Sequence, residues 1–255
     1  MIDWTQFTLF LYILARMSGF VLFNPILGRR TIPAIFRSGL ILLLSVSVIS
    51  STQQTVEVPA TTVELIIHLL LELAVGLLLG MAVNFFFYIP QLAGEVIDTQ
   101  MAMTMNQIYD ASSQANLSTT AVLFNVAMSL LFFAANGHHT LLRILLTSGQ
   151  VVPFGEIAFD TTVFQAMLQL FIQCTLLAVK LCMPILAAEL VGEIGMGILM
   201  KVIPQINVFS INIELKVIIG LFLIFVLISP FSEFLLQIEE QMLGSLSEIL
   251  QLTAA

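Results

Sequence analysis

The stretch YIPQLAGEVIDTQMAMTMNQIYDASSQAN, residues 88–116, sets this chain apart from an ordinary membrane protein. It lies between two strongly apolar blocks, contains no Lys or Arg, and is rich in Gln, Asn, Ser and Met. It is too long to be a short turn and too uncharged to be a usual cytoplasmic loop. Irregular backbone at membrane depth must be enclosed by protein or line a cavity, because lipid cannot pair its polar groups. The stretch therefore predicts a constriction in a pore.

The rest of the chain consists mainly of apolar blocks. The 255 residues are 59% hydrophobic and only 9% charged, whereas a soluble domain is about a quarter charged. Blocks fall at about 7–27, 32–50, 62–89, 119–136, 163–189 and 211–235, and roughly 20 such residues cross a bilayer as a helix. Prolines lie at or inside several blocks, where they break helices. We therefore predict an all-α integral membrane protein with about six hydrophobic helices, several of them broken, arranged as helical hairpins.

The final segment and the remaining composition narrow the class further. Residues 232–253 are apolar at helical spacing with glutamates between, which predicts an amphipathic helix packed on a partner or at an interface. The net charge of −8 leaves no basic patch for phosphates, so nucleic acid is excluded as a partner. No metal-ligand spacing and no activated-nucleophile motif occurs in the sequence. We therefore predict no cofactor and no catalytic site, and the protein is not expected to be an enzyme.

Charged side chains recur inside the apolar blocks. Glu64, His68 and Glu72 follow one another every four residues and so share one helix face. An ionised group costs a few kcal/mol at a bilayer centre on insertion scales, so these groups should face protein or water. We predict that Arg16 pairs with a carboxylate. The residues predicted to lie at subunit interfaces are Arg16, Glu64, Glu72, Glu95, Glu189 and Glu193. A proton path along the Glu64 face is the alternative, since histidine titrates near neutrality.

Five motifs in order carry a family resemblance. They are ARMSGF at 15–20, NPILGRRTIPAIFR at 24–37, YIPQLAGEVIDTQM at 88–101, NGHHTLL at 136–142 and IPQINVF at 203–209. Together they resemble the FliR/SctT family, membrane proteins of the flagellar export apparatus and of type III secretion, over nearly the whole chain. Where family members tend to have glycines or an Asp-Pro, this chain has Asp98, Ala102 and Asp110-Ala111.

The resemblance implies an architecture and a function. Residues 1–160 would form a FliP-like helical part, and residues 161–255 a FliQ-like hairpin with the amphipathic C-terminal helix. The chain would be a core subunit of the flagellar type III export gate, in the bacterial inner membrane at the flagellar basal body. Its expected partners are FliP-like and FliQ-like subunits, FlhB-like and FlhA-like components, and the unfolded export substrates.

The resemblance also implies that a loop from about residue 103 to residue 117 closes the pore. Methionine suits this task, because its unbranched side chain fills gaps and moves aside. On an extended segment the three methionines at 101, 103 and 105 would all face the lumen, and on a helix they would form a collar instead. The predicted pore-closing residues are Met101, Met103, Met105, Asn106, Gln107, Ile108, Tyr109, Asp110, Ser112, Ser113, Gln114 and Asn116.

Two plainer interpretations stay open at this point. The methionines could simply fill a protein core. The broken helices and intramembrane carboxylates would also suit a secondary transporter for an ion or small solute.

Overall fold

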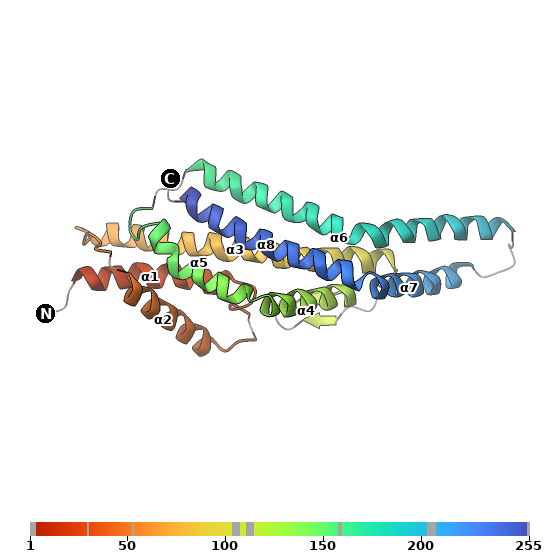
Figure 1. Cartoon of the computed structure of the whole chain (residues 1–255), viewed down its shortest axis with the longest axis horizontal. Helices are drawn as coiled ribbons and strands as arrows, with labels where there is room; N and C mark the ends of the chain where they lie inside the picture. The colour runs from red at the N-terminus through yellow and green to blue at the C-terminus, as the bar shows by residue number, and fades with distance from the viewer. Residues whose placement is uncertain are drawn as a thin grey trace. The chain divides into compact units, whose positions relative to one another are not determined.

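The computed structural model describes residues 4–29, 31–52, 54–103, 108–110, 115–157, 160–202 and 208–253 (Figure 1). Within them the helices are α1 Trp4–Phe23, α2 Ala34–Ser51, α3 Thr62–Gln100, α4 Thr119–Ala134, α5 Gly137–Val151, α6 Thr161–Val202, α7 Val208–Val226 and α8 Ile228–Thr253. This confirms the predicted helical membrane class. The short strands β1 Ile108–Asp110 and β2 Ala115–Leu117, which were not predicted, pair antiparallel.

Among the described residues, four helices are long and apolar enough to cross a membrane, namely α1, α2, α3 and α6. The pair α4 and α5 bends by 69°, and the pair of α7, from Asn212, and α8 bends by 64°; if each bent pair is one broken span, the count rises to six. The bend between α4 and α5 falls at Asn136, whose φ of 61° is left-handed and so ends the first helix. The sequence indicated a helix end there, but not the separate helix α5.

The chain folds as two compact units that interleave along the sequence. The first unit contains Met1–Phe86, Asn136–Ile172 and Glu239–Ala255, and the second contains Phe87–Ala135 and Gln173–Ile238. Three of the boundaries fall inside α3, α6 and α8, and the fourth falls between α4 and α5. The predicted FliP-like and FliQ-like parts divide the chain differently, at residues 160 and 161, and they stay a prediction.

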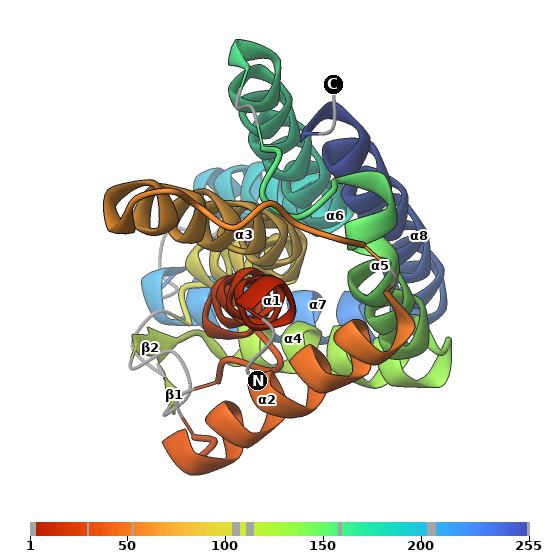
Figure 2. The same ribbon diagram turned by 90° about the vertical axis from the view of Figure 1, so that its left-hand side faces the viewer.

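In the first unit, α1 lies between α2 and the first part of α3 (Figure 2). Glycines let α1 and α3 approach closely. A Cβ atom on Gly19 would collide with the carbonyl oxygen of Leu73, and one on Gly76 with the carbonyl oxygen of Arg16. Small residues at such crossings are typical of helix packing in membranes.

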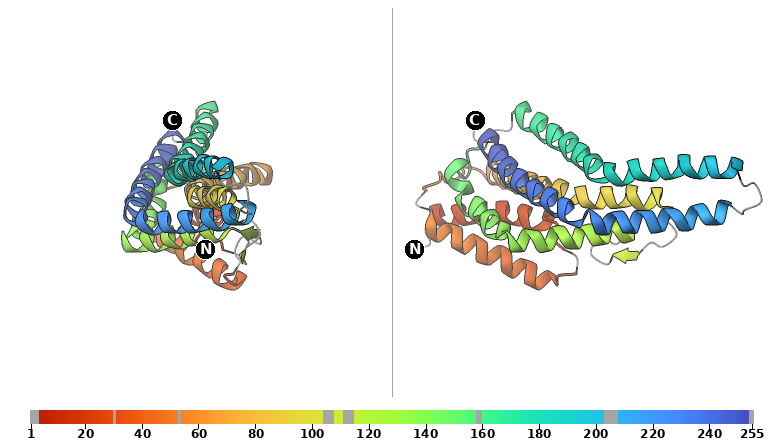
Figure 3. Two further views of the ribbon diagram at one scale, coloured as in Figure 1. Left: turned by 90° about the vertical axis from the view of Figure 1, so that its right-hand side faces the viewer. Right: turned by 45° about the vertical axis from the view of Figure 1, so that its right-hand side comes forward.

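In the second unit, the later part of α6 and α7 run antiparallel as a hairpin (Figure 3). Lys216 on α7 pairs with Glu193 on α6. The rings of Phe124 on α4 and Phe231 at the start of α8 meet edge to face, 5.4 Å between centroids. These contacts join α6 to α7 and α4 to α8 within the second unit.

Candidate pore-closing segment and its base

Helix α3 carries the first part of the opening motif. It continues through Pro90, which removes one backbone donor from the helix, to Gln100. Glu95 accepts a hydrogen bond of 3.2 Å from Nε2 of Gln91, one turn earlier on the same helix. The segment is thus a continuous helix to Gln100 that contains Pro90, and the candidate closing loop, residues 103–117, begins beyond it.

Two nested backbone hydrogen bonds end α3 at Gln100. The N–H of Met103 donates to the carbonyl oxygen of Asp98 at 2.8 Å, and that of Ala102 donates to the carbonyl oxygen of Thr99 at 3.2 Å. This pattern, with Ala102 in the left-handed region at φ 59°, is a Schellman motif. Glycine adopts that conformation without a Cβ clash, whereas alanine does so at a cost. The closing loop therefore leaves α3 at a fixed point.

The start of α4 is held by two side chains. The hydroxyl of Ser118, the N-cap residue, accepts from the N–H of Ala121 at 3.3 Å. The carboxylate of Asp98 accepts from the N–H of Thr120 at 3.0 Å and also from the Thr120 hydroxyl. Both Asp98 and Thr120 are buried. A carboxylate near a helix N-terminus also meets the positive end of the helix dipole.

Tight packing surrounds this junction. A Cβ atom on Gly94 of α3 would collide with the backbone of Ala121 on α4. The side chain of Met101 is fully buried, and its sulfur would collide with a Cβ atom added to Gly220 of α7. Met101 therefore packs in the core of the second unit, beneath the loop, and Met103 is half-buried. Met101 directly follows the last residue of α3, and Met105 lies outside the described residues, so the arrangement of the three methionines stays a prediction.

The loop itself contains a short hairpin. Its register pairs Ile108 with Leu117, Tyr109 with Asn116, and Asp110 with Ala115. Backbone pairing of this kind satisfies polar groups inside the segment, as a pore-lining loop requires. The predicted residues Met105, Asn106, Gln107, Ser112, Ser113 and Gln114 lie outside the described residues.

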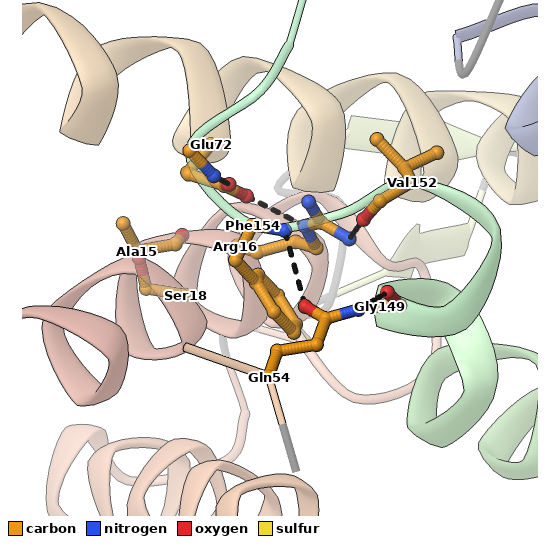
Figure 4. Close-up of polar contacts among 9 residues, drawn as sticks. Ala15, Arg16, Ser18, Gln54, Glu72, Gly149, Val152 and Phe154 are labelled. Atoms are coloured by element: carbon orange, nitrogen blue, oxygen red, sulfur yellow. Dashed lines mark hydrogen bonds and ion pairs between the residues drawn. The ribbon is translucent and has the colours of Figure 1, made fainter. Parts of the chain in front are cut away.

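A second polar cluster lies in the first unit, around Arg16 (Figure 4). Nε of Arg16 donates to Glu72 at 2.6 Å, and Nη1 donates to the carbonyl oxygen of Val152 at 3.0 Å. The guanidinium lies 4.2 Å from the ring centroid of Phe154. The other oxygen of Glu72 accepts from the N–H of Gly155 at 2.8 Å. The predicted carboxylate partner of Arg16 is thus Glu72 of the same chain, and both side chains are 0% exposed.

The cluster joins two connections of the first unit, between α2 and α3 and between α5 and α6, to the helices α1 and α3. Nε2 of Gln54, between α2 and α3, donates to the carbonyl oxygen of Gly149 at 2.5 Å. Oε1 of Gln54 accepts from the N–H of Phe154 at 3.4 Å (Figure 4). Removing one partner of such a buried ion pair would leave an uncompensated charge. We call Arg16, Gln54, Glu72, Phe154 and Gly155 the first-unit clasp.

The other predicted interface carboxylates have separate surroundings. Glu64 accepts from the N–H of Ala60 at 2.9 Å and so caps the start of α3, in an exposed position. His68 lies beside Tyr12, with ring centroids 5.8 Å apart. Glu189 on α6 is 1% exposed, and neither of its carboxylate oxygens has a hydrogen-bond partner among the described residues. Whether these groups, with Glu95 and Glu193, contact other subunits stays a prediction.

Sequence reasoning missed the residues that build the base of the loop. Asp98 and Thr120 are separated by 22 residues, and Gly220 comes from another helix altogether. The pattern Ser-Thr-Thr before an apolar block does indicate a helix start at 118–120. No local pattern indicates that its second cap comes from α3.

Comparison with known proteins agrees with these observations. The sequence matches the family model described as bacterial export proteins, family 1, over residues 7–242. It is 26% identical over 230 residues to the flagellar biosynthetic protein FliR of Escherichia coli strain K12, covering 89% of this chain and 88% of that protein. Identity to FliR of Bacillus subtilis strain 168 is 29% over 235 residues, covering 88% and 87%. The surface presentation of antigens protein SpaR of Shigella flexneri is 27% identical over 213 residues, covering 83% and 81%.

Proposed function

This chain belongs to family 1 of the bacterial export proteins, and from that premise we propose that its closing loop, residues 103–117, seals the pore of the flagellar type III export gate. The family is a non-enzymatic one of membrane proteins in the flagellar and type III export apparatus. The single observation that carries the proposal is the loop with both of its ends fixed. It leaves α3 at a Schellman motif and enters α4 at a double N-cap.

The chemistry of the loop suits a seal that opens. A gate must hold back ions yet admit a chain about 10–12 Å wide where it is helical. The three residue pairs of the hairpin, Ile108–Asp110 with Ala115–Leu117, pair backbone groups with each other, so these strands can move together without losing that pairing at membrane depth.

The proposed location is the bacterial inner membrane at the flagellar basal body, in a complex with FliP-like and FliQ-like subunits. FlhB-like and FlhA-like components and unfolded export substrates are the further proposed partners. The helices offer large apolar surfaces to such neighbours or to lipid: Ile35 on α2 is 83% exposed and Phe225 on α7 is 76% exposed. In this proposal residues 1–160 correspond to the FliP-like part and residues 161–255 to the FliQ-like part.

The transporter alternative needs a carboxylate that exchanges ions. Glu72 is a poor candidate, because Arg16 and the N–H of Gly155 occupy its two oxygens. Purification in detergent followed by native mass spectrometry distinguishes the two functions. A subunit of the export gate should be recovered in a complex with different subunits at unequal stoichiometry, and recovery only as a stable homodimer would contradict this function.

Deletion of residues 107–111 tests the seal. We expect the complex to assemble and to conduct small ions that the parent complex holds back. The matched control replaces the same number of residues in the loop between α2 and α3, at 56–60, with Gly and Ser, and should not leak. An assembled deletion complex with the parent's conductance would refute the proposal.

A further inference from the structure

We propose that Asp98 is a positioning residue that fixes the two ends of the closing loop to each other. When the pore opens, the end of α3 and the start of α4 then remain together. This inference rests on the proposed function of the loop. The group formed by Gly94, Asp98, Met101, Thr120, Ala121 and Gly220 is called the basal clamp.

One residue holds both ends of the loop. The carbonyl oxygen of Asp98 accepts from the N–H of Met103, where the chain leaves α3. Its carboxylate accepts from the N–H and the hydroxyl of Thr120, where the chain has just entered α4. The loop is therefore closed at its base by contacts to a single position, whatever its own conformation.

Burial makes separation of the two helices costly. Asp98 is 0% exposed and Thr120 is 3% exposed, so the carboxylate depends on the donors of Thr120 for the hydrogen bonds it would otherwise make to water. Pulling α4 away from α3 would leave that charge without these donors in an apolar interior, which is strongly unfavourable. Movement of the loop beyond Met103 breaks none of these bonds.

Close packing also opposes separation of α3 from α4. Gly94 brings the backbone of α3 against the backbone of Ala121 on α4. Met101 fills the space beside Gly220, which ties the end of α3 to α7. Interiors packed in this way resist small displacements, because each shift opens a void or creates a clash. The clamp is thus a rigid support from which the loop projects.

Substitutions at the clamp test the positioning role. In the assembled complex, Asp98→Asn places an amide N–H₂ or a weaker uncharged acceptor opposite the donors of Thr120. We expect the resting ion conductance to rise about tenfold, because the uncharged amide holds the start of α4 less tightly than the carboxylate does. Thr120→Val, which keeps the backbone donor and loses the hydroxyl, should give a smaller, several-fold rise.

Matched controls lie elsewhere in the same chain. Asp160→Asn removes a carboxylate that also accepts from a threonine N–H and hydroxyl at a helix start, that of α6, in an exposed position. Thr147→Val makes the same threonine substitution on α5, where the hydroxyl bonds only within its own helix. Neither should raise the conductance. Parent-like conductance in both Asp98→Asn and Thr120→Val would overturn the proposal, as would equal leaks in the controls.

A reversible cross-link tests whether the base opens during export. The double variant Asp98→Cys/Thr120→Cys is made in a chain whose buried Cys174 and Cys182 are replaced by alanine. Under reducing conditions we expect a leaky complex, and after oxidation a tight complex that still exports. A loss of export on oxidation that reduction restores would show that α3 and α4 must separate, and would overturn the proposal.

Failure of this inference is distinguishable from failure of the proposed function. If the loop does not seal the pore, deletion of residues 107–111 leaves the conductance unchanged. If the loop seals but Asp98 does not position it, the deletion leaks while Asp98→Asn and Thr120→Val stay tight.

Discussion

The first-unit clasp and the basal clamp both depend on a buried carboxylate, but the partners of the two carboxylates differ in kind. Glu72 neutralises the buried cation Arg16 and accepts from one backbone N–H, across segments that are far apart in the sequence. Among the described residues, no cation donates to Asp98, which accepts from the N–H and the hydroxyl of Thr120 at the start of α4. The ion pair holds helices and connections of the first unit together, whereas Asp98 holds the two ends of a loop.

This difference shows how one part of the chain can be held rigidly while a loop elsewhere is held at its ends. A buried ion pair penalises any movement of the elements it joins. A carboxylate that caps a helix from a neighbouring helix holds those two helices and leaves the chain between them to its own contacts.

Breaking the clasp from one side should have the largest effect. Glu72→Ala leaves Arg16 as a buried charge without its carboxylate, so we expect a loss of about 3–5 kcal/mol in stability. The readout is thermal unfolding of the purified complex in detergent, together with the amount that assembles. The double variant Arg16→Met/Glu72→Leu replaces both charges by apolar groups and should recover most of the loss. A single variant as stable as the parent would contradict the structural role of the pair.

A larger side chain at the crossing of α3 and α4 should have the second largest effect. Gly94→Val places a side chain against the backbone of Ala121, and overpacking of this kind costs about 1–3 kcal/mol. Gly244→Ala on α8 is the control, because an added Cβ there meets nothing within 4 Å. We expect a lower unfolding temperature and a leak for the first variant, and no leak for the second. Equal behaviour of the two would show that the close approach at Gly94 is unimportant.

Relaxing the stop of α3 should stabilise the protein. Ala102 has φ 59°, so Ala102→Gly relieves a left-handed alanine at a gain of about 1 kcal/mol. The unfolding temperature should rise by a few degrees while the resting conductance stays that of the parent. Destabilisation would mean that the helix does not end in the left-handed conformation described here.

The exposed cap at Asp160 should have the smallest effect. The backbone N–H of Thr161, and then its hydroxyl, hold the pKa of Asp160 below its usual value. A carboxyl whose pKa is lower in the folded state contributes stability above its unfolded pKa and loses that contribution as the pH falls through the folded pKa. Asp160→Asn should therefore weaken the acid dependence of the unfolding temperature slightly below about pH 4, and leave it unchanged near neutrality. An altered profile at neutral pH would contradict this assignment.

Local features of the sequence predicted much of the fold. The apolar blocks indicated the helices, and α3 continues through Pro90 to Gln100 without a break. The polar, uncharged composition of residues 88–116 indicated an irregular segment between two apolar blocks, and the family resemblance placed the loop at about 103–117, which the structure bounds by Met103 and Ser118. Each of these features arises from residues close together in the chain. The hairpin was not predicted, because strands of three residues have no periodicity to detect.

Contacts between distant residues could not be predicted in the same way. Arg16 and Glu72 are 56 residues apart, so the sequence indicated that a carboxylate was needed but not which one. On an extended segment Met101 would face the lumen together with the two other methionines, whereas α3 continues to Gln100 and the side chain of Met101 is fully buried. The donors that hold Asp98 lie in another helix, where no spacing rule reaches.

The proposal that residues 103–117 close the pore is tested most directly by the ion current through single assembled complexes in a planar bilayer. The parent complex should carry no resting current, and the complex lacking residues 107–111 should show stepwise increases in current. The absence of current through both complexes would contradict the proposal.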